Sequence, residues 1–272
     1  MLVFPNCKIN IGLRITEKRP DGFHNIESVF YPVPWYDALE IIESNETRLF
    51  ITGLEIPGNL SNNLCIRAWR LLKNDFSGLP PVDIYLHKTI PTGAGLGGGS
   101  ANGAFMLKAL NEKFSLGLST NDLCSYAIQL GSDCPFFIIN SPAFARQRGE
   151  NLEPLQLPLN GLTLTMVNPG IHINTGWAFG RLKPNYPASP IESLVHLPIG
   201  QWAEAGIGND FQNPVVNEYP EIASILEKLK RHGALFASMT GTGSTCYGFF
   251  KDSPSLFHED FPPHYLVKKI SL

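Results

Sequence analysis

Hydrophobic residues along much of the chain come in short runs separated by polar turns, a pattern typical of β-strands. By this pattern we expect strands at residues 7–15, 26–33, 38–42, 82–87, 162–167, 237–239 and 245–250. The run at residues 82–87 alternates apolar and polar positions, as a half-buried strand does. The turn at residues 19–22 separates the first two strands.

Other segments carry apolar residues at helical spacing, which predicts helices at residues 62–72, 100–114, 120–130, 178–182 and 220–232. Ser61 or Asn62 is suited to cap the first of these helices, and Ser119 the third. Gly233 follows the last one in a C-terminal capping position. The elements together predict a mixed α+β protein that divides near residue 150, with domains at residues 1–152 and 153–272.

Composition and charge exclude several classes of protein. Hydrophobic residues make up 43% and charged residues 17% of the chain, which excludes a disordered protein. The formal net charge is −3, so no strong positive field favours nucleic acid or an anionic membrane. The N-terminus lacks the pattern of a signal peptide, and no apolar run approaches the roughly 20 residues of a membrane span. We therefore expect a soluble cytoplasmic protein that binds neither nucleic acid nor membrane.

The five cysteines are scattered along the chain, and none forms a Cys-x-x-Cys pair. Zinc sites need cysteines and histidines at short, regular spacing, which this sequence does not have. An odd number of separate thiols fits a reducing compartment better than a disulfide framework. The sequence therefore assigns no metal ligands, and the carboxylates Glu17, Asp21 and Glu27 are expected at the surface.

The densest feature of the chain is a glycine-rich segment at residues 91–100, with five glycines between Gly93 and Gly99. Glycine lets the backbone approach a ligand closely, and the amides at the start of the following helix form a positive site for phosphate. Neither standard phosphate motif fits. A dinucleotide fingerprint needs an acidic residue about 20 positions later, and a Walker loop needs a lysine before the serine. A flexible turn is the structural alternative.

The segment resembles the ATP-binding loop of the GHMP kinases, and further motifs of that family follow in the same order along the chain. Within the family, the motifs are most similar to those of the member that phosphorylates an alcohol linked to cytidine diphosphate, in isoprenoid precursor synthesis. The matching segments are residues 7–11, 19–24, 91–100, 131–137, 168–179, 209–211 and 239–244.

The resemblance implies a two-lobed α+β fold, with an N-terminal lobe like the second domain of ribosomal protein S5 and a ferredoxin-like C-terminal lobe. It implies ATP with Mg²⁺ as the phosphoryl donor. Its acceptor would be a small molecule carrying a cytidine diphosphate group. We expect a monomer or a weak homodimer.

Two charged residues are the candidates for catalysis. A carboxylate can accept the hydroxyl proton as the new phosphate ester forms, and the resemblance gives this role to Asp133. Lys8 lies in an otherwise apolar stretch, where an ammonium group is costly unless it is paired or near the surface. An ion pair would keep Asp133 ionised. From the residues alone, a helix-end aspartate and a surface lysine are the alternatives.

The resemblance assigns the nucleotide to the glycine-rich segment and to two residues outside it. The candidate ATP-binding residues are Pro91, Thr92, Gly93, Ala94, Gly95, Leu96, Gly97, Gly98, Gly99, Ser100 and Ala101, with Asn63 and Lys88 near the adenine or ribose. Ser100 is a candidate for contact with Mg²⁺ or phosphate and also for an ordinary helix cap. A second glycine turn at residues 241–243 is expected to pack beside the first.

The candidate substrate-binding residues are Asn10, Phe23, His24, Thr175 and Phe179. The resemblance places Phe23 and Phe179 on the two faces of a cytosine ring, with His24 at its edge. Stacking tolerates any base, so discrimination needs hydrogen bonds to the base edge. Phe23 stands where the family usually has tyrosine, which preserves the stacking face and removes a hydroxyl. Asn10 and Thr175 are expected near the alcohol or the diphosphate.

Two other functions remain open at this stage. A silent nucleotide-binding protein would have no chemical need for Lys8 and Asp133. A kinase for another alcohol, such as mevalonate or homoserine, would have no need for Phe23, His24 and Phe179. For Arg146 and Arg148, a phosphate clamp and a solvated charged turn are the alternatives, and the turn is favoured.

Overall fold

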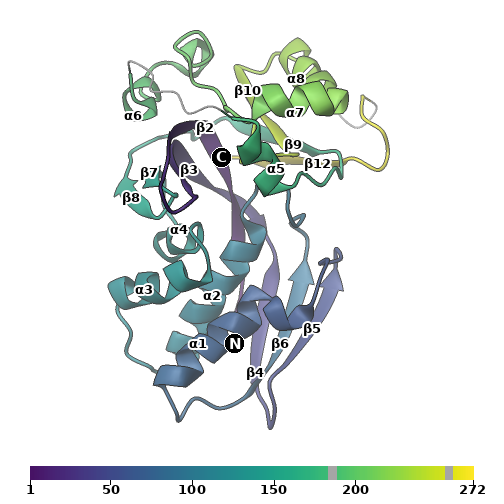
Figure 1. Cartoon of the computed structure of the whole chain (residues 1–272). Helices are drawn as coiled ribbons and strands as arrows, with labels where there is room; N and C mark the ends of the chain where they lie inside the picture. The colour runs from purple at the N-terminus through teal and green to yellow at the C-terminus, as the bar shows by residue number, and fades with distance from the viewer. Residues whose placement is uncertain (183–188, 255–259) are drawn as a thin grey trace. The chain divides into compact units, whose positions relative to one another are not determined.

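The computed structural model describes residues 1–182, 189–254 and 260–272. The chain forms two compact units (Figure 1). The first unit consists of Met1–Lys8, Pro34–Thr92 and Gly97–Ser141, and the second of Ile9–Val33, Gly93–Leu96 and Pro142–Leu272. Each unit is assembled from separate stretches of the chain. The domain boundary at residue 152 stays a prediction.

The first unit is a four-stranded sheet covered by helices. Its strands lie in the order β1 (Leu2–Val3), β4 (Ala38–Glu43), β6 (Val82–Lys88) and β5 (Arg48–Gly53). β4 is antiparallel to β1 and β6, whereas β5 and β6 run parallel. The helices are η1 (Leu60–Asn62), α1 (Leu64–Asp75), α2 (Gly98–Lys113), α3 (Thr120–Leu130) and α4 (Cys134–Ile139).

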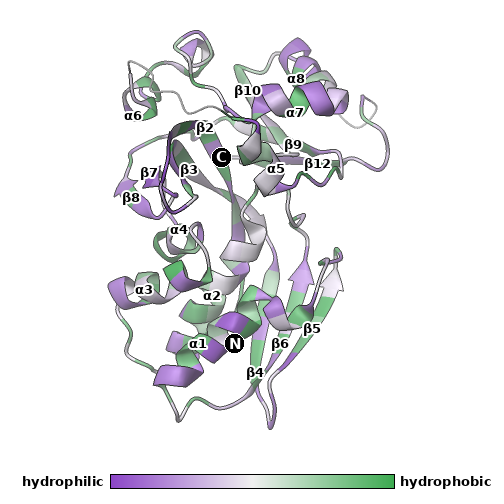
Figure 2. Ribbon diagram, in the orientation of Figure 1, coloured by the Kyte–Doolittle hydropathy of each residue, from purple (hydrophilic) through white to green (hydrophobic). Residues whose placement is uncertain are grey.

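Helices α1 and α2 lie side by side in this unit (Figure 1), and α2 also packs on α4 and contacts β1 and β4. Small residues allow the close approach of α1 and α2. A Cβ built on Gly103 would lie 2.9 Å from the Cβ of Leu64. Hydrophobic positions run along α1, α2 and the strands (Figure 2), and Ala101, Ala104 and Leu107 are completely buried.

The second unit contains two sheets. One has the order β2 (Asn6–Lys18), β3 (His24–Tyr36), β7 (Ala143–Gln147) and β8 (Asn151–Pro154), and the ends of β2 and β3 belong to the first unit. The other has the order β10 (Phe236–Met239), β11 (Cys246–Phe250), β9 (Thr163–Asn168) and β12 (Leu266–Ser271), with all pairs antiparallel. The helices are α5 (Thr175–Gly180), α6 (Ile191–Leu194), η2 (Ile199–Gln201), α7 (Gln212–Glu218) and α8 (Pro220–Arg231).

Helix α8 supplies much of the core of the second unit. Its buried residues Ile222, Ile225 and Leu229 share one cluster with Val167 and Phe250 from the β9–β11 sheet. The helix carries hydrophilic positions on its other side (Figure 2), and Gly233 ends it with a left-handed φ of 86° and an amide hydrogen bond to Lys230. This amphipathic pattern is what the sequence showed, and the capping role of Gly233 is confirmed.

The sequence located most of the long elements correctly, and the mixed α+β fold is confirmed. The helix predicted from residue 100 begins two residues earlier, because Gly97 takes the left-handed conformation and Gly98 and Gly99 are already helical. The elements missed from the pattern are short or half exposed. They are β1, β5, β7, β8 and β12, with α4, α6, α7, η1 and η2.

The predicted cap of the first helix was wrong. Asn59 starts the turn η1, so the α-helix begins only at Leu64, and Asn63 caps it by accepting a hydrogen bond of 2.9 Å from the Cys65 amide. The prediction for Ser119 is confirmed, since its hydroxyl accepts from the Asp122 amide and the Asp122 carboxylate accepts from the Ser119 amide. Across the described ranges of the chain, no helix is both long and apolar enough to span a bilayer.

We predict that Ser119→Ala lowers the free energy of unfolding by about 1 kcal/mol, because it removes one half of this capping box. Urea denaturation followed by circular dichroism measures the change. Ser125→Ala is the control. Its hydroxyl binds only the Asn121 carbonyl within the same helix, so its effect should stay within about 0.5 kcal/mol. A loss for Ser119→Ala no larger than for the control would contradict the capping role.

Candidate active site

Lys8 and Asp133 form an ion pair in the first unit. Lys8 lies near the start of β2, and its Nζ is 3.3 Å from Oδ2 of Asp133 at the start of α4. The lysine side chain is 4% exposed and the aspartate side chain 32%. Burial raises the pKa of the neighbouring Cys7 thiol far above its usual value, so Cys7 places no negative charge beside Lys8. The geometry thus presents a carboxylate that reaches solvent and is held by a buried cation.

Asp133 occupies the N-cap position of α4, but its side chain does not cap the helix. Aspartate at this position usually accepts a hydrogen bond from the first turn of its own helix. Here the carboxylate turns toward Lys8 instead. The alternative of a simple helix-end aspartate therefore does not account for its orientation.

Gly97 lets Lys8 approach the glycine-rich segment. Its φ is 69°, and a Cβ at this position would lie 2.9 Å from Cζ of Phe137 and 3.2 Å from Cε of Lys8. A side chain here would be strained in its backbone and would displace the lysine. The end of the glycine-rich segment and the catalytic candidates are therefore packed together within the first unit.

The start of α2 has no side-chain cap, since its N-cap residue is Gly97. The first amides of an uncapped helix have no partner within the helix, and with the helix dipole they attract an anion. Gly99 is exposed, and no atom lies within 4 Å of the place where its Cβ would be. Ser100 lies beside the buried Cys134 thiol, whose pKa burial raises to about 12. Ala101 is completely buried and makes no open surface.

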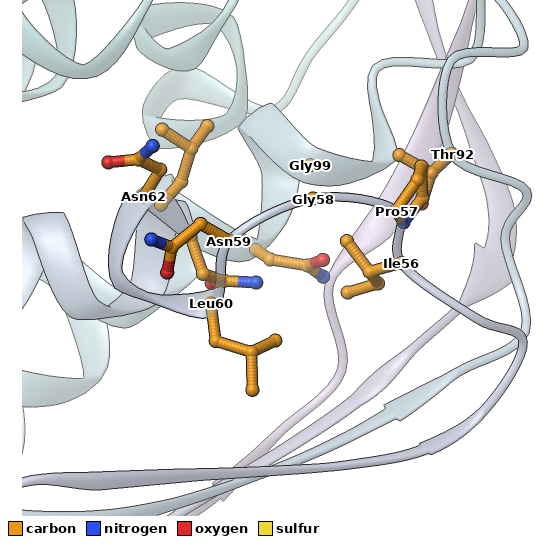
Figure 3. A pocket seen from close by; sticks show the side chains of 11 residues that line it. Ile56, Pro57, Gly58, Asn59, Leu60, Asn62, Thr92 and Gly99 are labelled. Carbon is orange, nitrogen blue, oxygen red and sulfur yellow. The ribbon is translucent and has the colours of Figure 1, made fainter.

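A cavity of about 320 Å³ lies beside this helix start, entirely within the first unit (Figure 3). Ile56, Asn59 and Asn62 come from the segment that joins β5 to α1, and Gly99 comes from α2. The complete lining is Ile56, Pro57, Gly58, Asn59, Leu60, Asn62, Asn63, Leu64, Thr92, Gly99 and Asn102. The structure thus brings three of the predicted ATP-binding residues together, Asn63, Thr92 and Gly99.

Lys88 lies at the end of β6 and differs from the other nucleotide candidates. Its side chain is 1% exposed and is paired with Asp37, which is fully buried. Its Nζ also donates a hydrogen bond of 3.1 Å to Oδ1 of Asn102. The prediction of a direct contact with adenine or ribose does not fit this placement, because the ammonium group is enclosed by protein atoms. Sequence reasoning missed Asp37 and Asn102, the two residues that bind the Lys88 ammonium group.

Residues 93–96 of the glycine-rich segment belong to the second unit and pack on the second glycine turn. A Cβ on Gly95 would overlap the Thr240 carbonyl oxygen, and the Thr240 hydroxyl donates a hydrogen bond of 3.0 Å to the Gly95 carbonyl. The Thr245 amide donates to the carbonyl of Ala94. The expectation that the second glycine turn packs beside the first is confirmed. Leu96 is buried and anchors the segment.

Asn10 is buried in the same unit and is fixed by hydrogen bonds. Its Nδ2 donates to the Ser28 hydroxyl over 2.9 Å, and its backbone amide donates to the Thr240 hydroxyl over 2.9 Å. The hydroxyl of Tyr247 donates to its carbonyl oxygen. The residue is 2% exposed, so Asn10 ties β2 to the second glycine turn.

A tight turn between β2 and β3 explains the motif at residues 19–24. The Arg19 guanidinium donates to both carboxylate oxygens of Asp21, and the Phe23 amide donates to Oδ1 of Asp21 over 3.1 Å. The hydrogen bond from Arg19 is the main cause that lowers the pKa of Asp21. This closed turn leaves Phe23 52% exposed and places His24 at the start of β3.

The aromatic residues of the predicted cytosine site are arranged differently from the expectation. Phe179 on α5 stacks on His24, with ring centroids 4.8 Å apart and an angle of 24°, and it also meets the ring of Phe211 edge to face. Phe23 instead lies under the Arg148 guanidinium, 5.0 Å from the ring centroid. Phe23 and Phe179 therefore do not form a pair of facing rings here. Burial, with a smaller effect of the Lys18 charge, lowers the pKa of His24, which favours the neutral imidazole.

The remaining sequence candidates are exposed or already paired. Thr175 is exposed at the start of α5, which Asn174 caps. Arg146 pairs with Glu153 and Glu192, and Arg148 pairs with Glu150, so carboxylates neutralise both arginines. A phosphate clamp is not formed by these two residues.

His172, which sequence reasoning also missed, lies with its Nδ1 about 3.0 Å from the Cβ position of Gly93. Within the described parts of the chain, no group of three or more histidine, cysteine or acidic residues is placed to hold a metal.

Comparisons with known proteins agree on one family of kinases. The GHMP kinases N terminal domain matches residues 63–141, and the GHMP kinases C terminal domain matches residues 191–257. The 4-diphosphocytidyl-2-C-methyl-D-erythritol kinase of Bacteroides fragilis is 48% identical over 265 residues, which cover 96% of each chain.

Solved structures show the same relationship in three dimensions. A crystal structure of 4-(cytidine 5'-diphospho)-2C-methyl-D-erythritol kinase superimposes with a TM-score of 0.77 and 29% identity, covering 91% of this chain and 89% of the other. The mevalonate kinase of Methanococcus jannaschii superimposes with a TM-score of 0.68 over 100% and 98% of the two chains. Its identity of 10% makes this second likeness one of fold alone.

The glycine-rich segment offers a matched pair of substitutions that should affect stability in opposite directions. Gly97→Ala should lower the free energy of unfolding by about 1–2 kcal/mol or more, because alanine is strained at positive φ and meets Phe137 and Lys8. Gly99→Ala should raise it by about 0.5 kcal/mol, because Gly99 is helical and its Cβ would meet open space. Denaturant unfolding measures both. Equal effects of the two substitutions would show that the close packing around Gly97 is absent.

Proposed function

The chain belongs to the 4-diphosphocytidyl-2-C-methyl-D-erythritol kinases of the GHMP family, and from this premise we propose the reaction and the roles of its residues. The reaction transfers the γ-phosphoryl group of ATP to the 2-hydroxyl of 4-diphosphocytidyl-2-C-methyl-D-erythritol, in the non-mevalonate isoprenoid pathway. The predicted fold class and kinase activity are confirmed by this membership. The observation that carries the proposed mechanism is the Lys8–Asp133 ion pair beside Gly97.

Asp133 acts as the general base on the acceptor hydroxyl. As the new O–P bond forms, the hydroxyl proton passes to the Asp133 carboxylate and the bond to the ADP leaving group breaks. The buried ammonium of Lys8 holds the carboxylate in position, because its Nζ lies 3.3 Å from Oδ2 of Asp133. The partial exposure of Asp133 leaves an oxygen accessible to a substrate.

The nucleotide binds through backbone groups and the cavity beside α2. The uncapped amides at the start of α2 bind phosphate oxygens, which fits a chain whose net charge is close to zero. The cavity of about 320 Å³ has the size of a small ligand site, and Asn59, Asn62 and Asn63 offer amide groups to an adenine or a ribose. Asn63 has its Oδ1 committed to the helix cap, so its contribution to the ligand is its amide nitrogen.

Mg²⁺ is suited to this site as an ion held mainly by the triphosphate. Mg²⁺ usually keeps several waters and takes only one or two protein ligands, so the absence of a carboxylate cluster in the described residues is compatible with it. The Ser100 hydroxyl and the exposed carboxylate oxygen of Asp133 are the protein groups placed near the helix start. When bound, the ion neutralises negative charge on the phosphoryl oxygens.

The acceptor binds in the second unit through the cytidine group. His24 is neutral because its pKa is lowered, so its imidazole can donate one hydrogen bond and accept another at the edge of the base. Phe179 supplies a stacking face. This face is covered by the His24 ring, and a bound base would take the place of that ring in the stack. Phe23 remains a second stacking candidate because it is largely exposed. Asn10 shapes this region from within the fold, and Thr175 presents its hydroxyl to solvent. The cytoplasmic location and the monomer or weak homodimer stay predictions.

Asp133→Asn should lower kcat by about 10²–10⁴-fold, because the amide cannot accept the proton. The dissociation constant of ATP should change less than about twofold, since backbone amides dominate its binding. Steady-state kinetics and nucleotide titration measure the two effects separately. Asp75→Asn is the control, an exposed aspartate that bonds the Tyr126 hydroxyl and should leave kcat unchanged. Parallel losses of kcat and ATP binding would indicate a folding role for Asp133.

The KM for the cytidine substrate should depend on pH through His24. The pKa of His24 lies below its ordinary value of about 6.5, so the ring is neutral at pH 7 and becomes charged only as the pH falls below that value. We expect KM to be flat from about pH 8 to 6.5 and to rise at lower pH. His24→Gln should raise KM at pH 7 and remove the pH dependence. Parallel pH profiles of the two proteins would show that another group titrates.

A further inference from the structure

We propose that Asp37, Lys88 and Asn102 form a buried network that positions the nucleotide-binding segment, without any of the charged groups touching the nucleotide. The inference rests on the proposed function only in taking ATP as the ligand. All three residues lie in the first unit, and their side chains are almost completely enclosed. Lys88 is here a positioning residue, in place of the direct nucleotide contact predicted from the sequence.

The Asp37 carboxylate, between β3 and β4, is the centre of the network. Its Oδ1 accepts hydrogen bonds from the backbone amides of Thr89 and Ile90, over 2.8 and 3.0 Å. Its Oδ2 accepts from the Nδ2 of Asn102 over 2.8 Å and from the Nζ of Lys88. A carboxylate with four donors at fixed positions has no alternative orientation of similar energy, since any rotation leaves buried donors without partners.

Asn102 closes the network from α2. Its Nδ2 donates to the aspartate while its Oδ1 accepts from Lys88 over 3.1 Å, so one amide group binds both members of the ion pair. Within the protein, the Lys88 ammonium thus has two acceptors and the Asp37 carboxylate has four donors. Removing one partner of such a pair leaves a buried charge uncompensated, whereas removing both charges does not.

The network joins the two ends of the glycine-rich segment. Thr89 and Ile90 directly precede it, and Asn102 lies one helical turn after Gly98, near its end. Gly98 packs on the same residues, because a Cβ there would lie 2.9 Å from Cγ2 of Ile90 and 3.4 Å from Nζ of Lys88. The separation of the two ends, and with it the direction of the α2 amides, is therefore set by the carboxylate that binds both.

The network also reaches the cavity. Asn102 and Gly99 line the cavity beside α2, so a displacement of Asn102 moves one wall of the site. The described hydrogen bonds of the network stay among its three members and the backbone that precedes the glycine-rich segment, whereas Asp133 pairs with Lys8. The network should thus govern nucleotide affinity and leave acceptor binding and the chemical step largely unaffected.

The test uses Asp37→Asn in the full chain, which is isosteric and replaces the acceptor for Lys88 and Asn102 with a neutral amide. The dissociation constant of an N-methylanthraniloyl derivative of ATP, titrated with Mg²⁺, should rise at least about tenfold, a size typical of a misplaced binding group. The KM for the cytidine substrate and kcat at saturating ATP should change less than about threefold.

The double variant Asp37→Asn with Lys88→Met distinguishes positioning from general stability. It leaves no uncompensated charge, and the amide introduced at position 37 retains a carbonyl oxygen for the amides of Thr89 and Ile90. We therefore expect the double variant to recover part of the nucleotide affinity.

Asp83→Asn is the matched control. Asp83 lies near the start of β6, the strand that ends at Lys88, and its carboxylate pairs with Arg48 rather than with the glycine-rich segment. The substitution removes a carboxylate from the same strand without touching the network, so it should leave nucleotide affinity unchanged.

Unchanged nucleotide affinity in folded Asp37→Asn would overturn the proposal. So would a parallel loss of nucleotide affinity, acceptor affinity and melting temperature, because a merely structural role predicts it. If Asp37→Asn does not fold, the double variant is measured instead. Unchanged nucleotide affinity in it, or a parallel loss of nucleotide affinity, acceptor affinity and melting temperature, would likewise overturn the proposal. The titration does not need turnover, so a wild-type protein that binds the nucleotide analogue without phosphorylating the cytidine substrate would refute the proposed function and still test the network.

Discussion

The active site depends on the requirement that a buried ammonium group must have a partner. Lys8 lies inside the first unit, where desolvation makes an unpaired charge costly, and Asp133 meets it at 3.3 Å. To do so, Asp133 gives up the capping role that its place at the start of α4 offers. Because of the ion pair, α4 has no side-chain cap. The Asp133 carboxylate is held in one position and still reaches solvent. This combination suits a base that must be ionised before the substrate arrives and accessible once it has bound.

The glycines of the glycine-rich segment serve different purposes at neighbouring positions. Gly97 has a left-handed backbone and leaves space for Lys8 and Phe137, and Gly95 leaves space for the Thr240 carbonyl. Gly99 has an ordinary helical backbone and open space before it, so neither packing nor backbone conformation requires glycine at this position. Asp37 binds the backbone amides of the two residues that precede the segment and, through Asn102, the helix that follows the segment. The glycine-rich segment, although flexible by composition, is thus held in one conformation by close packing and by a buried ionic network.

Local pattern was sufficient for the long elements and for the position of the glycine-rich segment, because periodicity and capping act over a few residues. Long-range partners were not visible in the same way. Asp37 meets Lys88 across 51 residues and Asn102 across 65, and the residues around each of them in the sequence do not mark the other two as partners. The stacking of His24 on Phe179 likewise joins distant segments, so the order of the aromatic rings could not be derived from spacing. Family resemblance supplied the positions of the candidate residues, and the structure supplied their partners.

Identification of the phosphorylated product determines whether the protein phosphorylates the 2-hydroxyl of the cytidine-linked alcohol. Purified protein is incubated with Mg-ATP and 4-diphosphocytidyl-2-C-methyl-D-erythritol, ADP is quantified by a coupled assay, and the products are followed by phosphorus NMR, with mevalonate and homoserine as alternative acceptors. We expect one new phosphomonoester, on the 2-hydroxyl of the cytidine-linked alcohol, for each ADP formed, and no comparable turnover with the other two alcohols. Absence of ADP with the cytidine-linked alcohol, or faster turnover of either alternative, would contradict it.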